Sequence, residues 1–166
     1  MKKTTIVYIF FLLNVLTTPM FLQAQDKATI TVTIKSLKAT STDACNGKMD
    51  FYAKIHIGEK VKNFPVREGN NLQELNWQFV ATTDKDVITP TIEIWDDDDS
   101  FCGGGDDAVS ISGSINKVRK TLNTSESQNL EYSSIGTSSR NGSEIGQITY
   151  SISIVPIKTK TQLLSQ

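Results

Sequence analysis

Residues 147–155 read QITYSISIV, and this stretch decides the fold class of the chain. Its large apolar side chains, Ile148, Tyr150, Ile152 and Ile154, fall at every second position and are separated by polar residues. Side chains of a β-strand point alternately to the two faces of a sheet, so this period of two predicts a strand with one buried face. The β-branched residues in the stretch favour the same conformation.

The same alternation recurs along the chain. Further strands are predicted for residues 28–37, 51–57, 77–81, 91–95, 109–113 and 130–135. Clusters of Gly, Asn, Asp and Ser separate these ranges, which is the chemistry of turns. No stretch has the period of an amphipathic helix, although residues 116–122 could form one short turn. Seven or eight short strands at this spacing predict an all-β protein, an antiparallel sandwich or barrel.

The first 24 residues have a different character. Two lysines precede an almost wholly apolar run at 6–16, and a Leu-Gln-Ala-Gln sequence follows it, which predicts a signal peptide cleaved after Ala24. An uncleaved anchor is the alternative, but the run is short for a membrane-spanning helix. We therefore expect an exported protein, periplasmic or extracellular. Residues 25–157 would form the folded domain and residues 158–166 a disordered tail.

Charge and cysteine content narrow the function further. The net charge is −1, and no cluster of basic and aromatic residues is present, so nucleic acid is not an expected partner. The chain contains two cysteines, Cys45 and Cys102. In an oxidising compartment such a pair predicts a disulfide bond, and two free thiols are the alternative.

The most unusual feature of the sequence is a run of acids between residues 96 and 107. It contains six carboxylates in twelve residues, and a like-charged pair at ~4 Å costs roughly 4 kcal/mol near a protein surface. A cation would remove that cost. Ca²⁺ takes six to eight oxygen ligands in flexible geometry, whereas zinc prefers His or Cys and magnesium keeps several waters. The alternative is an acidic loop extended in solvent.

Two details favour calcium over the solvated loop. Asp96 and Asp98 leave a strand at alternate positions, so they point to the same side and can share an ion. The glycines at 103–105 allow the chain to fold back and return Asp106 or Asp107 to the same place.

An EF-hand is excluded as the source of this pattern. Asp96, Asp98, Ser100 and Asp107 fit positions one, three, five and twelve of that loop, but position six is Phe101 where glycine is needed. Strands rather than helices also flank the loop.

Three stretches together resemble a known family, the C2 domains. Residues 49–57, MDFYAKIHI, are similar to the family's SDPYVKV strand, and residues 92–98, IEIWDDD, to its IEVWDxD strand and loop. Residues 147–156 resemble its closing strand. The three matches occur in the right order and span nearly all of the predicted domain. The resemblance implies an eight-stranded antiparallel sandwich that binds calcium between loops at one end and often engages phospholipid.

The resemblance also implies which residues hold the ion. The carboxylates come from two loops, and they are Asp43 and Asp50 in the first loop, with Asp96, Asp98 and either Asp106 or Asp107 in the third. The chain departs from the family in three ways. Phe51 replaces the usual proline after Asp50, the spacing from Asp43 to Asp50 is one residue longer, and the third loop is longer.

Other residues of these loops gain roles from the same resemblance. Cys45 and Cys102 would lie in neighbouring loops, so a disulfide between them would join the two halves of the site. A large apolar side chain beside a calcium site can insert into a membrane or contact a partner, and Phe101 is placed to do so. The alternative is that Phe101 folds back over the loop as a local lid. Lys48 and Met49 flank the other loop in a similar way.

These observations lead to one function and two rivals. We expect a monomeric, non-enzymatic module in which Ca²⁺ bridges the aspartates to an anionic phospholipid or another anionic partner. The first rival is a structural or protein-interaction sandwich in which calcium only rigidifies the loops. A hydrolase is the second, and it lacks an acid–base pair outside the acidic cluster.

Overall fold

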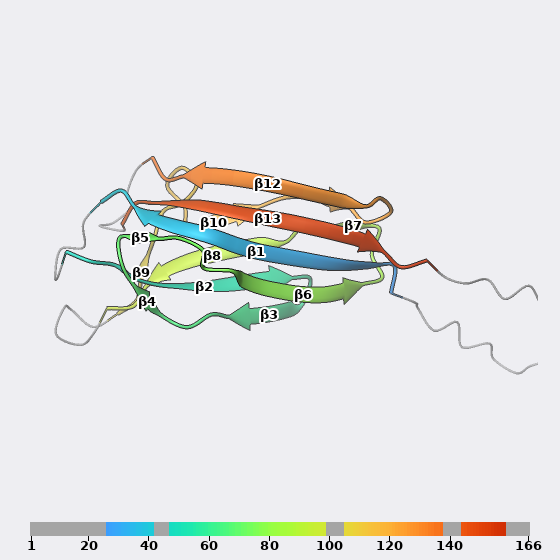
Figure 1. The fold of residues 1–166 in the computed structure, drawn as a ribbon, viewed down its shortest axis with the longest axis horizontal. Helices are drawn as coiled ribbons and strands as arrows, with labels where there is room; N and C mark the ends of the chain where they lie inside the picture. Colours follow the sequence, from blue (N-terminus) through green and yellow to red (C-terminus); the bar gives the residue numbers. More distant parts are fainter. Residues whose placement is uncertain (1–25, 42–46, 99–104, 138–143, 159–166) are drawn as a thin grey trace, which may run out of the picture.

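The computed structural model describes residues 26–41, 47–98, 105–137 and 144–158. They form an all-β antiparallel sandwich (Figure 1), which confirms the fold class predicted from the sequence. The five-stranded sheet contains β12 (Gln128–Ile135), β13 (Gly146–Pro156), β1 (Ala28–Ala39), β5 (Asn71–Leu72) and β6 (Trp77–Thr83). The six-stranded sheet contains β10 (Lys117–Arg119), β8 (Thr91–Asp96), β2 (Asp50–Ile57), β3 (Lys60–Asn63), β4 (Arg67–Glu68) and β9 (Asp107–Ala108). A two-stranded sheet joins β11 (Leu122–Asn123) to β7 (Val87–Ile88).

The core lies between the two larger sheets and is built from the alternating apolar residues. Antiparallel pairing of β1 with β13 sets Ile30 opposite Ile154 and Ile34 opposite Tyr150, and all four are almost completely buried. Phe51 is buried from the other sheet. Burial of a side chain of this size stabilises a fold by about 1.5–3 kcal/mol. The apolar residues that recur at every second position in the sequence are thus the residues that face the core. Within the described ranges there is no helix that is long and apolar enough to cross a membrane.

One predicted strand is wrong. Residues 109–113 do not form a regular strand, because single bridges join Ser110 to Ile145 and Gly113 to Gly136 in parallel orientation. Gly113 has a φ of 61°, which turns the chain there. Val109 and Ile111 are nevertheless fully buried, so their alternation reports core contact rather than sheet pairing.

The strand directions separate the sandwich into two different ends. β1 and β8 finish, and β2 begins, at the end drawn on the left of Figure 1, and the acidic residues lie there. The start of β1 and the end of β13 lie at the opposite end, where the Ile157 N–H donates to the Lys27 carbonyl at 2.7 Å.

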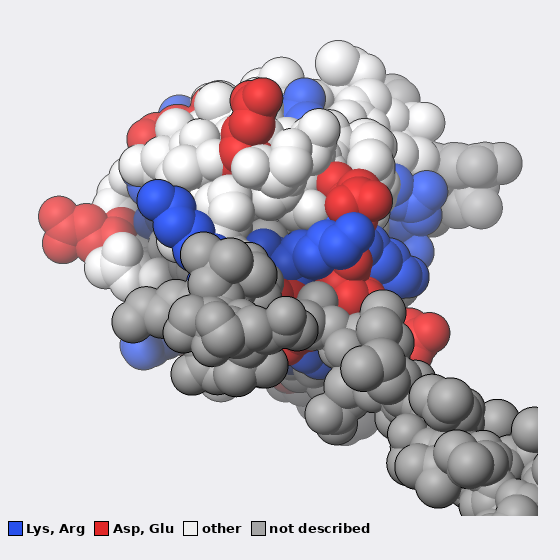
Figure 2. All heavy atoms as spheres, turned by 90° about the vertical axis from the view of Figure 1, so that its right-hand side faces the viewer, with Lys and Arg blue, Asp and Glu red and all other residues white. Residues whose placement is uncertain are grey.

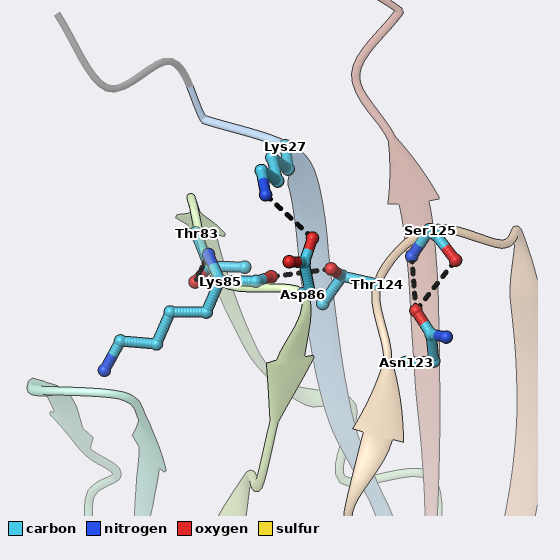
Figure 3. Close-up of polar contacts among 7 residues, drawn as sticks. All are labelled: Lys27, Thr83, Lys85, Asp86, Asn123, Thr124 and Ser125. Atoms are coloured by element: carbon cyan, nitrogen blue, oxygen red, sulfur yellow. Dashed lines mark hydrogen bonds and ion pairs between the residues drawn. The ribbon is translucent and has the colours of Figure 1, made fainter.

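The end opposite the acidic residues is closed by paired charges and hydroxyl groups. Lys27 Nζ lies 2.7 Å from Asp86 Oδ1, and Thr124 Oγ1 donates to the Lys85 carbonyl at 2.6 Å (Figure 3). Acidic and basic side chains are interspersed over the described part of this end (Figure 2). The six-carboxylate run of the other end therefore has no counterpart among the described residues here.

One side of the sandwich is sealed by two lysines. Lys60 Nζ donates to the Thr82 carbonyl at 3.1 Å and Lys62 Nζ donates to the Gln78 carbonyl at 2.8 Å. Both lysines belong to β3 and both acceptors belong to β6, so the side chains bridge the edges of the two sheets. Lysines at a sheet edge discourage pairing with another chain.

Candidate metal centre

Two aspartates are brought together by the strand register of the six-stranded sheet. Phe51 of β2 lies opposite Asp96 of β8, and Asp96 in turn lies opposite Asp107 of β9. Residues that oppose one another directly in antiparallel strands share a face, with Cβ atoms roughly 4.5–5.5 Å apart. Phe51 is fully buried, so the side chains of Asp96 and Asp107 leave the core-facing side of the sheet at its acidic end.

Asp50 is fixed to the same point through its backbone. Its N–H donates to Asp96 Oδ1, and its carbonyl accepts from the N–H of Asp97 at 3.0 Å. A carboxylate that accepts a backbone N–H is held in one orientation by a charge-assisted hydrogen bond. The start of β2 therefore positions the Asp96 carboxylate, which is only 2% exposed.

The structure separates Asp106 from Asp107, which sequence reasoning left open. Tyr52 lies one residue after Phe51, so its side chain is on the outer face of the sheet. Its hydroxyl donates to Asp106 Oδ2 at 2.5 Å. Asp106 is thus held on the outer face, while Asp107 shares the inner face with Asp96. Of the two candidates, Asp107 is the residue that the register places beside Asp96.

Tyr52 remains a hydrogen-bond donor at every physiological pH. Burial raises the pKa of its hydroxyl above the ordinary value of 10, and the hydrogen bond and charge of Asp106 raise it further. The carboxylates of Asp97 and Glu93 act in the same direction. Ionisation of Tyr52 would place a negative charge against these acids, so the Tyr52–Asp106 contact is a stable part of the outer face.

The loop aspartates after β8 alternate as the sequence predicts. Asp96 is buried, Asp97 is exposed and Asp98 is half-buried. This pattern agrees with an Asp96 and Asp98 pair on one side of the chain and Asp97 in solvent. The predicted site residues Asp43, Cys45, Phe101 and Cys102 lie outside the described residues, so their predicted roles remain predictions.

One proposed contact residue is wrong. Met49 is 0% exposed and belongs to the core, so it cannot present a side chain to a membrane or a partner. Its N–H donates to Asn70 Oδ1 at 3.0 Å, and its carbonyl accepts from the N–H of Gly69 at 2.8 Å, which fixes it beneath the loop. Lys48 is exposed and pairs with Glu68 at 2.5 Å. Alternation explains the difference, because neighbouring residues of an extended chain face opposite ways.

The outer face of β8 carries a second charged group that is distinct from the acidic loops. Lys117 Nζ lies 2.8 Å from Glu93 Oε1, and His56 Nε2 lies 3.4 Å from the same oxygen. Burial on its own would raise the pKa of Glu93, but the hydrogen bond and charge of Lys117 outweigh it, and His56 adds to them. The pKa therefore falls below its ordinary value of 4.5.

Loss of the Lys117 partner should weaken the fold in a pH-dependent way. The lowered pKa of Glu93 means that the pair stabilises the folded state above about pH 4.5, and this contribution is lost as the pH falls through the lowered value. We expect Lys117→Met to lower the unfolding free energy by about 1 kcal/mol at pH 7, after allowance for solvent screening of Lys117. The deficit measured by urea unfolding should be smaller at pH 3 than at pH 7.

Arg119→Met provides the matched control for that measurement. Arg119 is an exposed residue of the same short strand, and its replacement should change stability by less than about 0.5 kcal/mol at either pH. An equal deficit of Lys117→Met at pH 7 and pH 3 would contradict the assigned role of Glu93.

The chemistry of the acidic end fits a hard cation, but the described residues do not close a site alone. Asp50, Asp96, Asp98 and Asp107 offer only oxygen ligands, which Ca²⁺ prefers. Within the described ranges, however, no three His, Cys, Asp or Glu side chains converge closely enough to form a metal-binding group. A complete coordination shell would have to draw on further oxygens, of which the Asp43 carboxylate is the one predicted from the sequence.

Sequence reasoning missed two residues at this end. Tyr52 holds Asp106 across strands, and only the register between β2 and β8 reveals it. Glu144 is 8% exposed, and its carbonyl accepts the N–H of Ser110 at 2.7 Å. Its sequence neighbours are Ser, Gly and Ile, so no spacing or charge pattern distinguishes it from an ordinary loop glutamate.

Comparison with known proteins identifies the fold. No protein-family model matches the chain, and no curated protein matches it. Among solved structures, a C2 domain of plant Extended Synaptotagmin 1 superposes with a TM-score of 0.56 at 12% identity, over 81% of this chain and 99% of that one. Another solved C2 domain gives 0.51 at 12% identity, over 76% and 98%.

A match within a larger protein has the same character. Human GIVD cytosolic phospholipase A2 gives a TM-score of 0.54 at 14% identity, and covers 82% of this chain but only 17% of the phospholipase. The likeness therefore concerns a small part of that enzyme. The two matches of full domain length extend over most of this chain, so the described residues have the fold of a C2 domain.

Proposed function

We propose that the acidic end binds Ca²⁺ and that the bound ion attaches the protein to an anionic partner, in the first place a phospholipid surface. One observation carries this proposal, namely the direct cross-strand pairing of Asp96 with Asp107. Like charges directly opposite each other destabilise a sheet. A divalent cation at this position would turn the repulsion into shared coordination.

The burial of Asp96 supports the same conclusion. A carboxylate that is 2% exposed is costly to keep ionised unless hydrogen bonds or a positive charge compensate it. The Asp50 N–H supplies one hydrogen bond. A calcium ion would supply the charge, with Asp96, Asp107, Asp98 and Asp50 as its ligands from the described residues and Asp43 as the expected ligand from the first loop.

The remaining coordination positions provide the link to a partner. Ca²⁺ takes six to eight oxygens, and four or five carboxylates leave room for phosphate oxygens of a lipid headgroup. C2 domains are the structural neighbours of the chain, which favours this role over a purely structural one. Lys48, exposed at the same end and paired with Glu68 in the free protein, would turn its ammonium group towards an anionic surface.

Export is part of the proposal. The apolar run at residues 6–16 and the cleavage sequence around Ala24 support secretion to the periplasm or the medium. Calcium affinity there need only be modest, with a dissociation constant of about 0.1–1 mM as in extracellular calcium modules. A Cys45–Cys102 disulfide would then hold the two acidic loops together before the ion binds.

Co-sedimentation with liposomes tests the proposal directly. We expect the protein to pellet with vesicles of phosphatidylcholine and phosphatidylserine at millimolar Ca²⁺, and to stay in the supernatant with a chelator or with phosphatidylcholine alone. Magnesium at the same concentration should not replace calcium, because it dehydrates reluctantly and demands stricter geometry.

A thermal unfolding series separates this function from its rival. Ligand binding to the folded state stabilises by about 1.4 kcal/mol at ten times the dissociation constant. If Ca²⁺ raises the melting temperature but the protein never pellets, calcium only rigidifies the loops. If Ca²⁺ changes neither quantity, the metal site itself is wrong.

A further inference from the structure

The chain passes from one sheet to the other next to the proposed ion site. β4 pairs with β2 in the six-stranded sheet, and β5 pairs with β1 in the five-stranded sheet. Only Gly69 and Asn70 separate these two short strands, and both strands lie at the acidic end, on the left of Figure 1. The position of Asn70 therefore depends on both sheets.

Hydrogen bonds from Asn70 reach both sheets. The Ala39 N–H, at the end of β1, donates to the Asn70 carbonyl at 2.8 Å. The Met49 N–H, directly before β2, donates to Asn70 Oδ1 at 3.0 Å, and Asn70 Nδ2 donates to the Gly47 carbonyl at 2.7 Å. One residue thus ties the end of β1 to the start of β2.

The side chain of Asn70 has to donate on one side and accept on the other. A primary amide does both, whereas a carboxylate offers only acceptors and a methyl group offers neither. Asn70→Asp would leave the Gly47 carbonyl without its donor. Asn70→Ala would in addition leave the N–H of Met49 without its acceptor, and Met49 is completely buried, where a backbone N–H needs a partner.

The residue that follows Met49 connects this crossing to the acidic residues. It is Asp50, whose N–H donates to Asp96 Oδ1 and whose carbonyl accepts from the Asp97 N–H at 3.0 Å. A shift of Met49 would therefore move Asp50, and with it the group that orients the Asp96 carboxylate. Metal sites lose affinity when a group that orients a ligand is removed, although that group does not touch the ion.

We propose that Asn70 is a positioning residue of the ion site. Its amide holds the start of β2 against the end of β1, so that Asp50 and the Asp96 carboxylate stay next to each other. The amide bonds to backbone groups, so it acts through the chain rather than by binding the ion. This inference rests on the proposed function, because it needs an acidic end that binds Ca²⁺. An asparagine that merely stabilised the fold would change the melting temperature alone.

Asn70→Asp and Asn71→Asp separate this role from simple electrostatics. Each adds one carboxylate near the acidic end, and by charge alone each should tighten Ca²⁺ binding. Asn70→Asp, however, sets an acceptor against the Gly47 carbonyl, and we expect it to weaken Ca²⁺ binding by about 10-fold. Asn71 is exposed, and its Oδ1 accepts from Gln73 Nε2 at 2.6 Å, a bond that a carboxylate can keep. Asn71→Asp should therefore bind Ca²⁺ at least as tightly as the parent protein.

Asn70→Ala and Thr124→Val separate the role from a general loss of stability. Thr124 is 1% exposed, and its Oγ1 donates to the Lys85 carbonyl at the opposite end of the sandwich (Figure 3). Each substitution removes hydrogen bonds from a buried group, so we expect both variants to melt at a lower temperature than the parent protein. Asn70→Ala should also lose about 10-fold or more in Ca²⁺ affinity, whereas Thr124→Val should bind Ca²⁺ as the parent does.

Isothermal titration calorimetry with calcium chloride measures these affinities, and hydrogen exchange in calcium-free buffer reports on the hydrogen bond itself. The Met49 amide should exchange faster in Asn70→Ala and stay protected in Asn70→Asp, which keeps the acceptor.

Three results would overturn the assignment of Asn70 while the parent protein still binds Ca²⁺ and the proposed function stands. They are an Asn70→Asp variant that binds Ca²⁺ as tightly as the parent, a Met49 amide that stays protected in Asn70→Ala, and an equal loss of affinity in Thr124→Val. A parent protein that does not bind Ca²⁺ overturns the proposed function, and this inference with it.

Discussion

Replacing Asp96 by asparagine should lower the affinity for Ca²⁺ by roughly 100-fold or more. The substitution keeps an oxygen that can accept the Asp50 N–H, so the local hydrogen bond is preserved while the charge is lost. Loss of an outer-shell partner in metal sites already costs about 10–100-fold, and a direct ligand should cost at least as much. Isothermal titration calorimetry of the purified protein measures the dissociation constant for Ca²⁺ in each variant.

The neighbouring aspartates supply controls that differ only in the face they occupy. Asp97→Asn removes the same charge from an exposed residue one position along, and we expect less than about a threefold change, a surface-charge effect. Asp107→Asn should resemble Asp96→Asn, while Asp106→Asn should resemble Asp97→Asn. Equal losses at Asp106 and Asp107 would show that the register between β8 and β9 does not select the ligand.

The second large effect concerns stability and is expected from Gly136→Ala. A Cβ atom at this position would lie 2.1 Å from the carbonyl oxygen of Ser110 and 2.7 Å from its carbonyl carbon. Both are backbone atoms, and Ser110 is fixed by its own bonds to Glu144 and Gly146, so the clash cannot be relieved by a rotamer change. We expect a loss of about 3 kcal/mol or more, because overpacking forces the backbone to shift.

Thermal unfolding should register this loss as a fall of roughly 10 °C in the melting temperature. Gly105→Ala is the matched control, since nothing lies within 4 Å of the added Cβ there. That variant should unfold within a degree or two of the parent protein. If Gly136→Ala proves equally harmless, the close approach of residues 110 and 136 is wrong, and with it the end of β12.

The fold was predictable because its long strands alternate strictly. Ile30 to Ile34 in β1 and Ile148 to Ile154 in β13 face a single core, so a period of two carried the whole signal. The short edge strands carried no such signal in the sequence. Lys60–Asn63 in β3 is exposed at every position, and three residues in β10 are too few to show a period. Pairing with a neighbour defines these strands, and a pairing partner is invisible in a linear pattern.

The candidate site also has a part that could be predicted from the sequence and a part that could not. The sequence alone was enough to nominate Asp96, Asp98 and Asp107 as candidates, because carboxylates at the end of a strand are recognisable by their charge and spacing. The choice between Asp106 and Asp107 was not, because it depends on the partner of Tyr52 across two strands. Met49 was misassigned for the related reason that proximity to a loop in sequence does not say which way a side chain points.

The hydrogen bond from Ile157 to Lys27 shows where a label or a solid surface can be attached to the protein. It brings the first and last described strands to one pole of the molecule, and β1 runs from that pole for twelve residues, or about 40 Å, towards the aspartates. A fluorophore, affinity handle or sensor chip attached next to residue 27 or 157 therefore stands a full molecular length from the pole at which we propose that calcium binds. Such a label can report distance to a bilayer without obstructing it, and an immobilised protein presents its aspartates to the solution.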